Sequence, residues 1–291
     1  MKRTIATILA ASLTSFAVAQ DATTAPEQKA PALDATAKAP TPQELLEKNI
    51  ELMGGKDAWM KIKDITMKGQ FVVTGAGMGG PLMIRQKAPN QQLTTINISG
   101  IGEVKEGFDG TNGWELNPMT GPALKKGVAL EQAAREAKFS TFLNPLEGLT
   151  DARTTGTTEF GGQPCWEVVA KGPGGDVKMY FSKSAGSMSG MSMTADSPMG
   201  PLNVLTEMKG LKKFGDIMMT TEMTISMMGQ SQKLTITDVS FEPIEASVFD
   251  LPPQIATMVK ARDEAEKKAA EEKKKKGNQL EKPGLPKVTA E

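Results

Sequence analysis

The stretch "DITMKGQFVV", residues 64–73, decides the fold class of this chain. Its apolar residues Ile65, Met67, Phe71 and Val73 recur at every second position, and Gly69 falls in the same register. Successive side chains of a strand point to opposite faces, so this spacing is typical of a strand with one buried face. The stretch therefore predicts a sheet that is apolar on one side.

A helical segment is expected before this strand, over residues 41–62. Thr41 is suited to the N-cap, Pro42 to the first helical position, and Glu44 completes a capping box. Gly54 and Gly55 interrupt the helical pattern, and the short stretch "KDAWMKI" after them predicts a second helix.

Short strands separated by turn residues are expected after the first strand, interrupted by a helix around residues 129–139. The short connections favour antiparallel neighbours, and so many strands favour a sheet that curls. The sequence thus predicts a mainly β (α+β) protein: a large curled antiparallel sheet with helices on one face. The expected strands are "PLMIRQK", "QQLTTINIS", "EVKEGFD", "GWELN", "CWEVVAK", "VKMYFSK", "SMSGMSMTA", "LNVLTEMKG", "IMMTTEMTISMM" and "QKLTITDVSFE".

The two ends of the chain differ in composition from its middle. Residues 1–19 have a positive start, an apolar stretch and small residues at the end, which predicts a secretory signal peptide and a periplasmic protein. Residues 20–40 are rich in Ala and Pro and predict a flexible leader. Residues 41–258 form the expected domain, and residues 259–291 a charged tail, helical and then disordered.

The composition excludes several classes of function. The chain has no histidine, which removes histidine-based catalysis and histidine metal sites. Lys and Arg are spread along a chain of zero formal net charge, so nucleic-acid binding is not supported. The single cysteine, Cys165, is interpreted as a core residue. We therefore expect a protein that is not an enzyme and needs no cofactor.

Methionine is unusually frequent, with 19 residues, and two interpretations of it stay open. "MSGMSM", residues 188–193, has thioether spacing that could hold Cu(I). Alternatively, methionines that alternate along strands point inward, where their flexible side chains suit varied apolar contacts. The second interpretation is favoured, without deciding whether these residues meet a core or a ligand.

Further motifs give the folded part, residues 41–258, a resemblance to a known family. These are "KGQFVV" at Gly69–Val73, "IRQKAPNQQ", the hairpin with Asp109, Gly110, Trp114 and Pro118, and "VFDLPPQI" near the end. In this order they resemble the LolA-like family of periplasmic carriers that move lipoproteins to the outer membrane. Ala88 stands where the family has its basic residue before the proline, so the resemblance leaves Arg85 and Lys87 both as candidates for a polar contact.

The resemblance implies an open, incomplete β-barrel with helices covering its concave face and acyl chains of a lipid or lipoprotein bound between them. It also implies an inner-membrane donor, an outer-membrane acceptor and no bound metal. An envelope scaffold or interaction protein with a filled core is the alternative. The expected apolar lining consists of Trp59, Met67, Phe71, Met83, Phe108, Trp114, Met191, Met193, Met219 and Met223.

A Cu(I) titration separates the two interpretations of the methionines. If Met188, Met191 and Met193 serve apolar contacts, a variant with all three replaced by Leu should bind Cu(I) with the same affinity as the unchanged protein. A large loss of affinity in the variant would establish a thioether copper site instead.

Overall fold

The computed structural model describes residues 39–138, 140–172, 175–197 and 200–280. The chain divides into two compact units, Met1–Asp250 and Leu251–Glu291. The expected signal peptide, most of the expected leader and the end of the tail lie outside the described residues. The expected domain boundary at 258/259 falls inside a helix of the second unit.

The described part of the first unit begins with two short helices, α1 (Pro42–Leu52) and α2 (Lys56–Lys61). The expected capping box is present in α1: the Thr41 hydroxyl accepts from the Glu44 backbone N–H, and Glu44 accepts from the Thr41 backbone N–H at 2.6 Å. Gly54 and Gly55 both have positive φ and separate the two helices, as the sequence predicted.

In the residues that the structure describes, thirteen strands follow and form a single antiparallel sheet. Their bounds are β1 (Asp64–Thr74), β2 (Met78–Lys87), β3 (Gln91–Ile98), β4 (Gly102–Phe108), β5 (Gly113–Asn117), β6 (Gly121–Leu124), β7 (Thr150–Phe160), β8 (Gln163–Gly172), β9 (Gly175–Ser182), β10 (Met188–Ser197), β11 (Gly200–Phe214), β12 (Ile217–Met227) and β13 (Gln230–Ser240). The predicted fold class is confirmed. The sequence patterns did not identify β6 or β7.

The order of strands across the sheet is β6-β5-β4-β3-β2-β1-β13-β12-β11-β10-β9-β8-β7. Two runs of sequential neighbours are therefore joined at the centre, where β1 pairs with β13, for example Phe71 with Leu234. The short strand β6 and the long strand β7 are the two edges, and within the described residues they do not pair with each other. The sheet is thus open.

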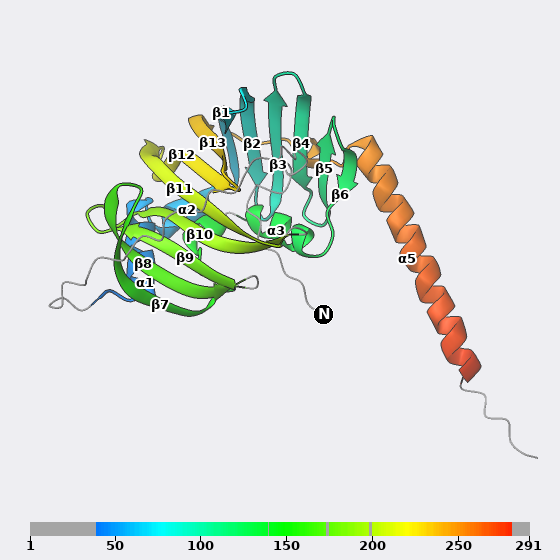
Figure 1. Ribbon diagram of the computed structural model, residues 1–291. Coiled ribbons are helices and arrows are strands. Elements are labelled where there is room, and N and C mark those ends of the chain that lie inside the picture. Colours follow the sequence, from blue (N-terminus) through cyan, green and yellow to red (C-terminus); the bar gives the residue numbers. More distant parts are fainter. Residues whose placement is uncertain (1–38, 139, 173–174, 198–199, 281–291) are drawn as a thin grey trace, which may run out of the picture. The chain divides into compact units, whose positions relative to one another are not determined.

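The chain must cross from one edge of the sheet to the other between β6 and β7. Residues 125–149 make this crossing and contain α3 (Val128–Glu136) and α4 (Ser140–Leu143). Figure 1 shows the sheet of the first unit curled, with α1, α2 and α3 on its concave side. The helix expected at residues 129–139 is α3.

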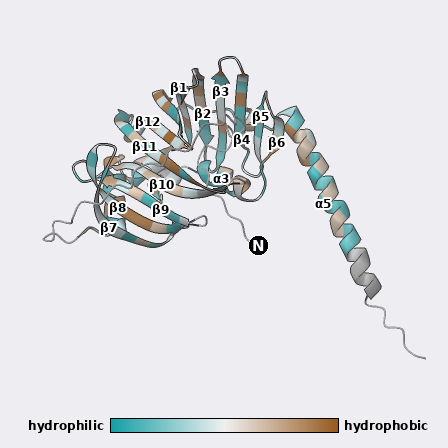
Figure 2. Ribbon diagram, in the orientation of Figure 1, coloured by the Kyte–Doolittle hydropathy of each residue, from teal (hydrophilic) through white to brown (hydrophobic). Residues whose placement is uncertain are grey.

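Polar and apolar residues alternate along many of the strands, as the bands of teal and brown in Figure 2 show. On the concave face, buried apolar side chains of ten strands and of α1 form one cluster, here called the inner cluster. It consists of Leu45, Phe71, Val73, Leu82, Ile96, Ile98, Val104, Val168, Ala170, Val177, Met179, Phe181, Met191, Met193, Val204, Ile225 and Leu234. The face that carries it is called the inner face, and the opposite face the outer face.

The hairpin that contains Trp114 has the predicted tight turn, but its tryptophan lies on the outer face. Asp109 fixes the turn by accepting from the backbone N–H groups of Thr111 and Asn112 at 2.7 and 2.6 Å. Trp114 pairs with Gly107 and is only 2% exposed. A Cβ atom on Gly107 would lie 2.4 Å from the indole ring, so only glycine leaves room for Trp114 here.

The end of the first unit packs back on the sheet, and the described part of the second unit, residues 251–280, contains one long helix. The 3-10 helix η1 (Ala246–Phe249) contacts β3. Helix α5 (Pro253–Leu280) begins at the second proline of "FDLPPQI" and includes the expected charged helix. Among the described residues, no helix is both long and apolar enough to cross a membrane.

Replacing Gly107 by Ala should destabilise the first unit by about 1–3 kcal/mol, because the added methyl group must displace the buried ring of Trp114. Urea unfolding followed by tryptophan fluorescence measures the change. Lys105→Ala, on the same strand and the same face, is the control and should change the free energy of unfolding by less than about 0.5 kcal/mol. Equal stability of the two variants would contradict this account of the hairpin.

Candidate ligand-binding face

The inner cluster is built almost wholly by strands among the described residues. Leu45 of α1 is its one helical member there, and the other members come from β1–β4 and β8–β13. Three of its side chains are the methionines Met179, Met191 and Met193. Four more, Met78, Met188, Met223 and Met227, are half-buried and pack against it. The concave face is therefore rich in unbranched, flexible side chains.

Helix α1 is attached to this face by one polar contact as well as by leucines. Asn49 is buried, and its side-chain oxygen accepts from the backbone N–H of Met188 at 2.9 Å. Leu45 and Leu46, one turn earlier, are both 4% exposed. The helix thus lies beside the start of β10, next to the methionines of that strand.

A second apolar cluster lies at α2. It joins Trp59 to Met67 of β1 and Met219 of β12, together with Ile65, Leu143 and Ile217. The Trp59 indole N–H donates to the Met53 carbonyl at 2.9 Å, so its polar atom is satisfied while the ring stays buried. Three of the residues expected to line the cavity, Trp59, Met67 and Met219, therefore come together here.

Helix α3 covers the inner face at β4 through small side chains. Phe108 packs against Ala133 and Ala137, with Leu130 and Ala134 beside them. At the end of the helix, the Gln86 side-chain amide donates to the Glu136 carbonyl at 2.9 Å. Alanines bury little area each, so α3 is held over the sheet by few apolar contacts.

Polar side chains interrupt the apolar inner face next to α3. Thr94, Glu106 and Glu115 stand directly opposite one another on β3, β4 and β5, and Gln86 lies diagonally beside Thr94 on β2. These four residues are called the polar patch. Lys125, just after β6, forms an ion pair with Glu106, and their side chains are only 12% and 11% exposed.

The pKa of Glu115 is raised above 4.5, first because burial removes water from its carboxyl group. The hydrogen bond that Asn117 donates at 3.1 Å lowers this pKa, the negative charge of Glu106 raises it, and Lys125 lowers it. The polar patch was not predicted from the sequence. Its signal was present in "EVKEGFD", where Glu106 occupies the apolar register between Val104 and Phe108.

The structure places the expected lining residues on two faces. Phe71, Met191 and Met193 belong to the inner cluster and Met223 borders it. Phe108 lies under α3 on the same face. Met83 instead stands opposite Lys68 and Thr95, and Trp114 opposite Gly107, so both lie on the outer face. In β2, apolar residues occupy neighbouring positions, and in β5 Trp114 and Leu116 alternate with Glu115, which faces inward. The alternation alone therefore does not tell which face of the sheet is the inner one.

The two basic residues expected to make a polar contact also lie on the outer face. Lys87 forms an ion pair with Asp64 at 2.8 Å and donates to the Ile244 carbonyl at 2.9 Å. It therefore holds the segment before η1 on the sheet. Arg85 stands opposite Thr66 and Leu93 and is half-buried. Neither side chain reaches the inner cluster.

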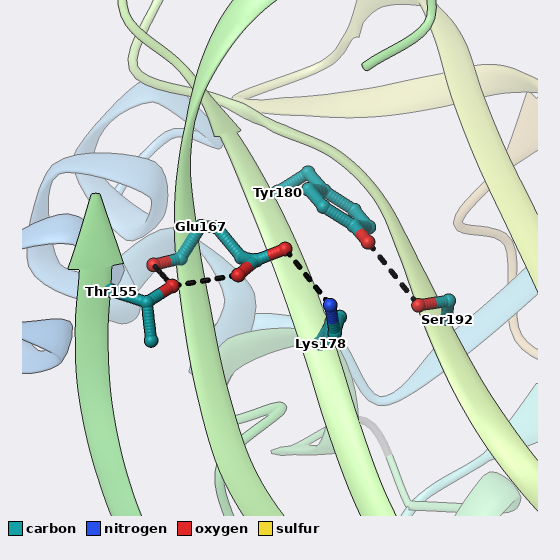
Figure 3. A network of polar contacts seen from close by, with 5 residues as sticks. All are labelled: Thr155, Glu167, Lys178, Tyr180 and Ser192. Carbon is teal, nitrogen blue, oxygen red and sulfur yellow. Dashed lines mark hydrogen bonds and ion pairs between the residues drawn. The ribbon is translucent and has the colours of Figure 1, made fainter. Parts of the chain in front are cut away.

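The outer face of the second half of the sheet carries a network of polar contacts, which Figure 3 shows. Glu167 accepts from Thr155 at 2.7 Å and pairs with Lys178 at 3.4 Å, while the hydroxyls of Tyr180 and Ser192 lie 3.3 Å apart. On the same face, Cys165 is fully buried in an apolar cluster with Phe160 and Tyr180, and burial raises the pKa of its thiol. Such a thiol is a poor nucleophile at neutral pH.

The described residues offer few groups of side chains that could bind a metal ion. In this part of the chain, no three His, Cys, Asp or Glu residues are grouped so that they could hold a metal ion. Met188, Met191 and Met193 all lie on the inner face, in or against the inner cluster. Their side chains therefore pack among apolar residues.

Replacing Glu115 by Gln should raise the free energy of unfolding at pH 7, and this stabilisation should disappear in acid. A carboxyl group whose pKa rises on folding binds its proton more tightly in the folded state. Its contribution to the free energy of unfolding therefore falls as pH rises from 4.5 through the raised value. Gln keeps an acceptor for Asn117 and cannot ionise.

Urea unfolding at pH 7 and at pH 4 measures this difference. The exposed Glu103→Gln, also on the first half of the sheet, is the control and should have little effect at either pH. An effect of Glu115→Gln that is the same at both pH values would show that its charge is not destabilising.

Comparisons with known proteins give structural likenesses only. No family model and no curated protein sequence matches this chain. A crystal structure of a LolA superfamily protein from Nitrosomonas europaea is similar over 73% of this chain and 99% of its own, with 14% identity and a TM-score of 0.47. A DUF1329 family protein from Desulfovibrio piger is similar over 72% of this chain and 96% of its own, with 8% identity and a TM-score of 0.48.

Proposed function

We propose that this protein binds the acyl chains of a lipid or lipoprotein on the inner face of its sheet and carries them without changing them chemically. The observation that carries the proposal is the inner cluster, an apolar surface contributed by ten strands of an open sheet. Backbone pairing does not close this sheet in the described residues, so side-chain contacts are what hold its concave face together.

The side chains of the inner cluster suit a ligand without directional groups. Methionine has three rotatable bonds and a polarizable sulfur, so it can repack around chains of different length and saturation. Met179, Met191 and Met193 are buried within the cluster, and the half-buried methionines stand at its border. The proposed entry of a chain would separate these residues and leave the backbone ladder intact.

The energetics favour partial burial of the acyl chains. Each methylene removed from water contributes about 0.8 kcal/mol. The residues of the inner cluster are already buried against one another, so a ligand replaces existing apolar contacts and gains less than this. A modest net affinity suits a carrier, because cargo bound near the practical limit of roughly 18–21 kcal/mol would not be released.

The periplasm is the proposed location, on the basis of the signal-like residues 1–19. A membrane donor and an outer-membrane acceptor belong to the proposal as well. The alternative, a scaffold with a filled core, is favoured by one observation: all members of the inner cluster are at most 9% exposed. The two functions differ in whether the cluster opens to a ligand.

Uptake of a fluorescent fatty acid by the full chain tests the proposal, with native mass spectrometry of protein purified from the envelope as a second measurement. The unchanged protein should bind the probe and carry a lipid adduct. Met227→Glu places a charge at the border of the inner cluster and should weaken probe binding by about tenfold or more, because a charge is costly beside an acyl chain.

Met228→Glu is the matched control. Met228 is the next residue along the chain, is 60% exposed and lies outside the inner cluster, so its substitution should leave probe binding unchanged. Circular dichroism establishes that both variants are folded. An unchanged protein with no adduct and no uptake of the probe would exclude the carrier and leave the filled-core scaffold.

A further inference from the structure

The inner face changes from apolar to polar within one step along β3 and β4, and within two steps along β2, where Ile84 lies between Leu82 and Gln86. Leu82, Ile96 and Val104 stand opposite one another and all belong to the inner cluster. The next inward positions carry Thr94 and Glu106, about 7 Å further along the strands. The polar patch therefore adjoins the inner cluster on the same face of the same strands.

Two atoms of the polar patch have no hydrogen-bond partner within the described part of the chain: the Thr94 hydroxyl oxygen and the Gln86 side-chain carbonyl oxygen. Thr94 is 3% exposed and Gln86 is 2% exposed. A buried polar atom without a partner is costly, and such atoms are uncommon in native proteins. Two of them side by side indicate a place where another molecule supplies the hydrogen bonds.

The hydrogen bonds of Gln86 determine what that molecule must offer. Its amide nitrogen donates to the Gln92 side-chain oxygen at 2.7 Å and to the Glu136 carbonyl at 2.9 Å. Both donors are thus used, and the remaining oxygen can only accept. The Thr94 hydroxyl can accept or donate. The missing partner is therefore a hydrogen-bond donor.

The charges around the patch select against an anionic group. Glu106 and Glu115 face each other across β4 and β5, and Lys125 pairs with Glu106. Two carboxylates next to one lysine repel a phosphate or carboxylate. An ammonium group would be attracted, but its transfer from water into a buried site is expensive, and Gln86 and Thr94 offer it only neutral oxygens. A hydroxyl group meets the requirement at the lowest cost of desolvation.

We propose that the polar patch binds the uncharged, hydroxyl-bearing end of an amphiphile whose acyl chain lies along the inner cluster. This rests on the proposed function and adds to it the class and the orientation of the ligand. The ligand hydroxyl donates to the Gln86 side-chain oxygen and accepts from the Thr94 hydroxyl, beneath the alanine-rich face of α3. A glycerol monoester of a fatty acid has this chemistry.

Two lipids with the same chain test the proposal on the full-length protein: 1-monooleoylglycerol, which carries hydroxyls, and methyl oleate, which carries none. The unchanged protein should bind the first more tightly. Thr94→Val removes the hydroxyl at nearly constant shape and should weaken binding of monooleoylglycerol about five- to tenfold, the effect of one hydrogen bond. Binding of methyl oleate should stay within about twofold.

Thr95→Val is the matched control, because Thr95 is the next residue of β3 and lies on the outer face, opposite Met83 and Lys105. It should change the affinity for neither lipid. Thermal unfolding without ligand gives a second measurement: Thr94→Val should keep or raise the midpoint, since it removes a buried hydroxyl without a partner.

The outcomes separate the two proposals. If both lipids bind with equal affinity and Thr94→Val changes neither affinity, the polar patch does not bind the hydroxyl-bearing end. The proposed carrier function would be unaffected by that result. Failure of the unchanged protein to bind either lipid would overturn both. If Thr94→Val binds neither lipid, the proposed role of the polar patch is also contradicted, because the Thr94 hydroxyl would then not distinguish the lipid with hydroxyls from the lipid without them.

Discussion

The pairing of β1 with β13 is the constraint on which the rest of the first unit depends. It places the first and last strands at the centre of the sheet, so that β6 and β7 become opposite edges. Since these two strands follow each other in the chain, the connection between them must run across the sheet. It runs on the concave side, where it carries α3 over β4 and β5. The cover of the polar patch is thus a consequence of strand order.

Much of this architecture could be predicted from the sequence. The alternation in residues 64–73 gave the correct face of β1, and the capping box gave the start of α1. The fold class followed from the spacing of turns. Strand β7 was missed because "TDARTTGTTEF" has no bulky apolar residue before Phe160, and edge strands need none. The short strand β6 contains Pro122, which is typical of an edge and reads as a loop.

The candidate site was predicted less well, for a physical reason. Alternation tells which residues share a face, but where both faces are covered it does not tell which face is concave. Trp114 and Met83 illustrate this, because both lie on the outer face although Trp114 is buried and Met83 is half-buried. The polar patch was missed because its glutamate stands where the pattern predicts an apolar residue. A glutamate in an apolar register is usually read as an exception, whereas its pairing with Lys125 depends on a contact that only the folded chain makes.

The central position of β1 and β13 also has a consequence for how the chain folds. Each half of the sheet pairs neighbours in sequence, so each can form through contacts that are local along the chain. The β1–β13 ladder joins Phe71 to Leu234, a separation of 234 − 71 = 163 residues. Closing so long a loop is slow relative to forming hairpins. The two halves can therefore acquire structure before they meet, and their apolar faces stay accessible to other molecules until that last ladder forms.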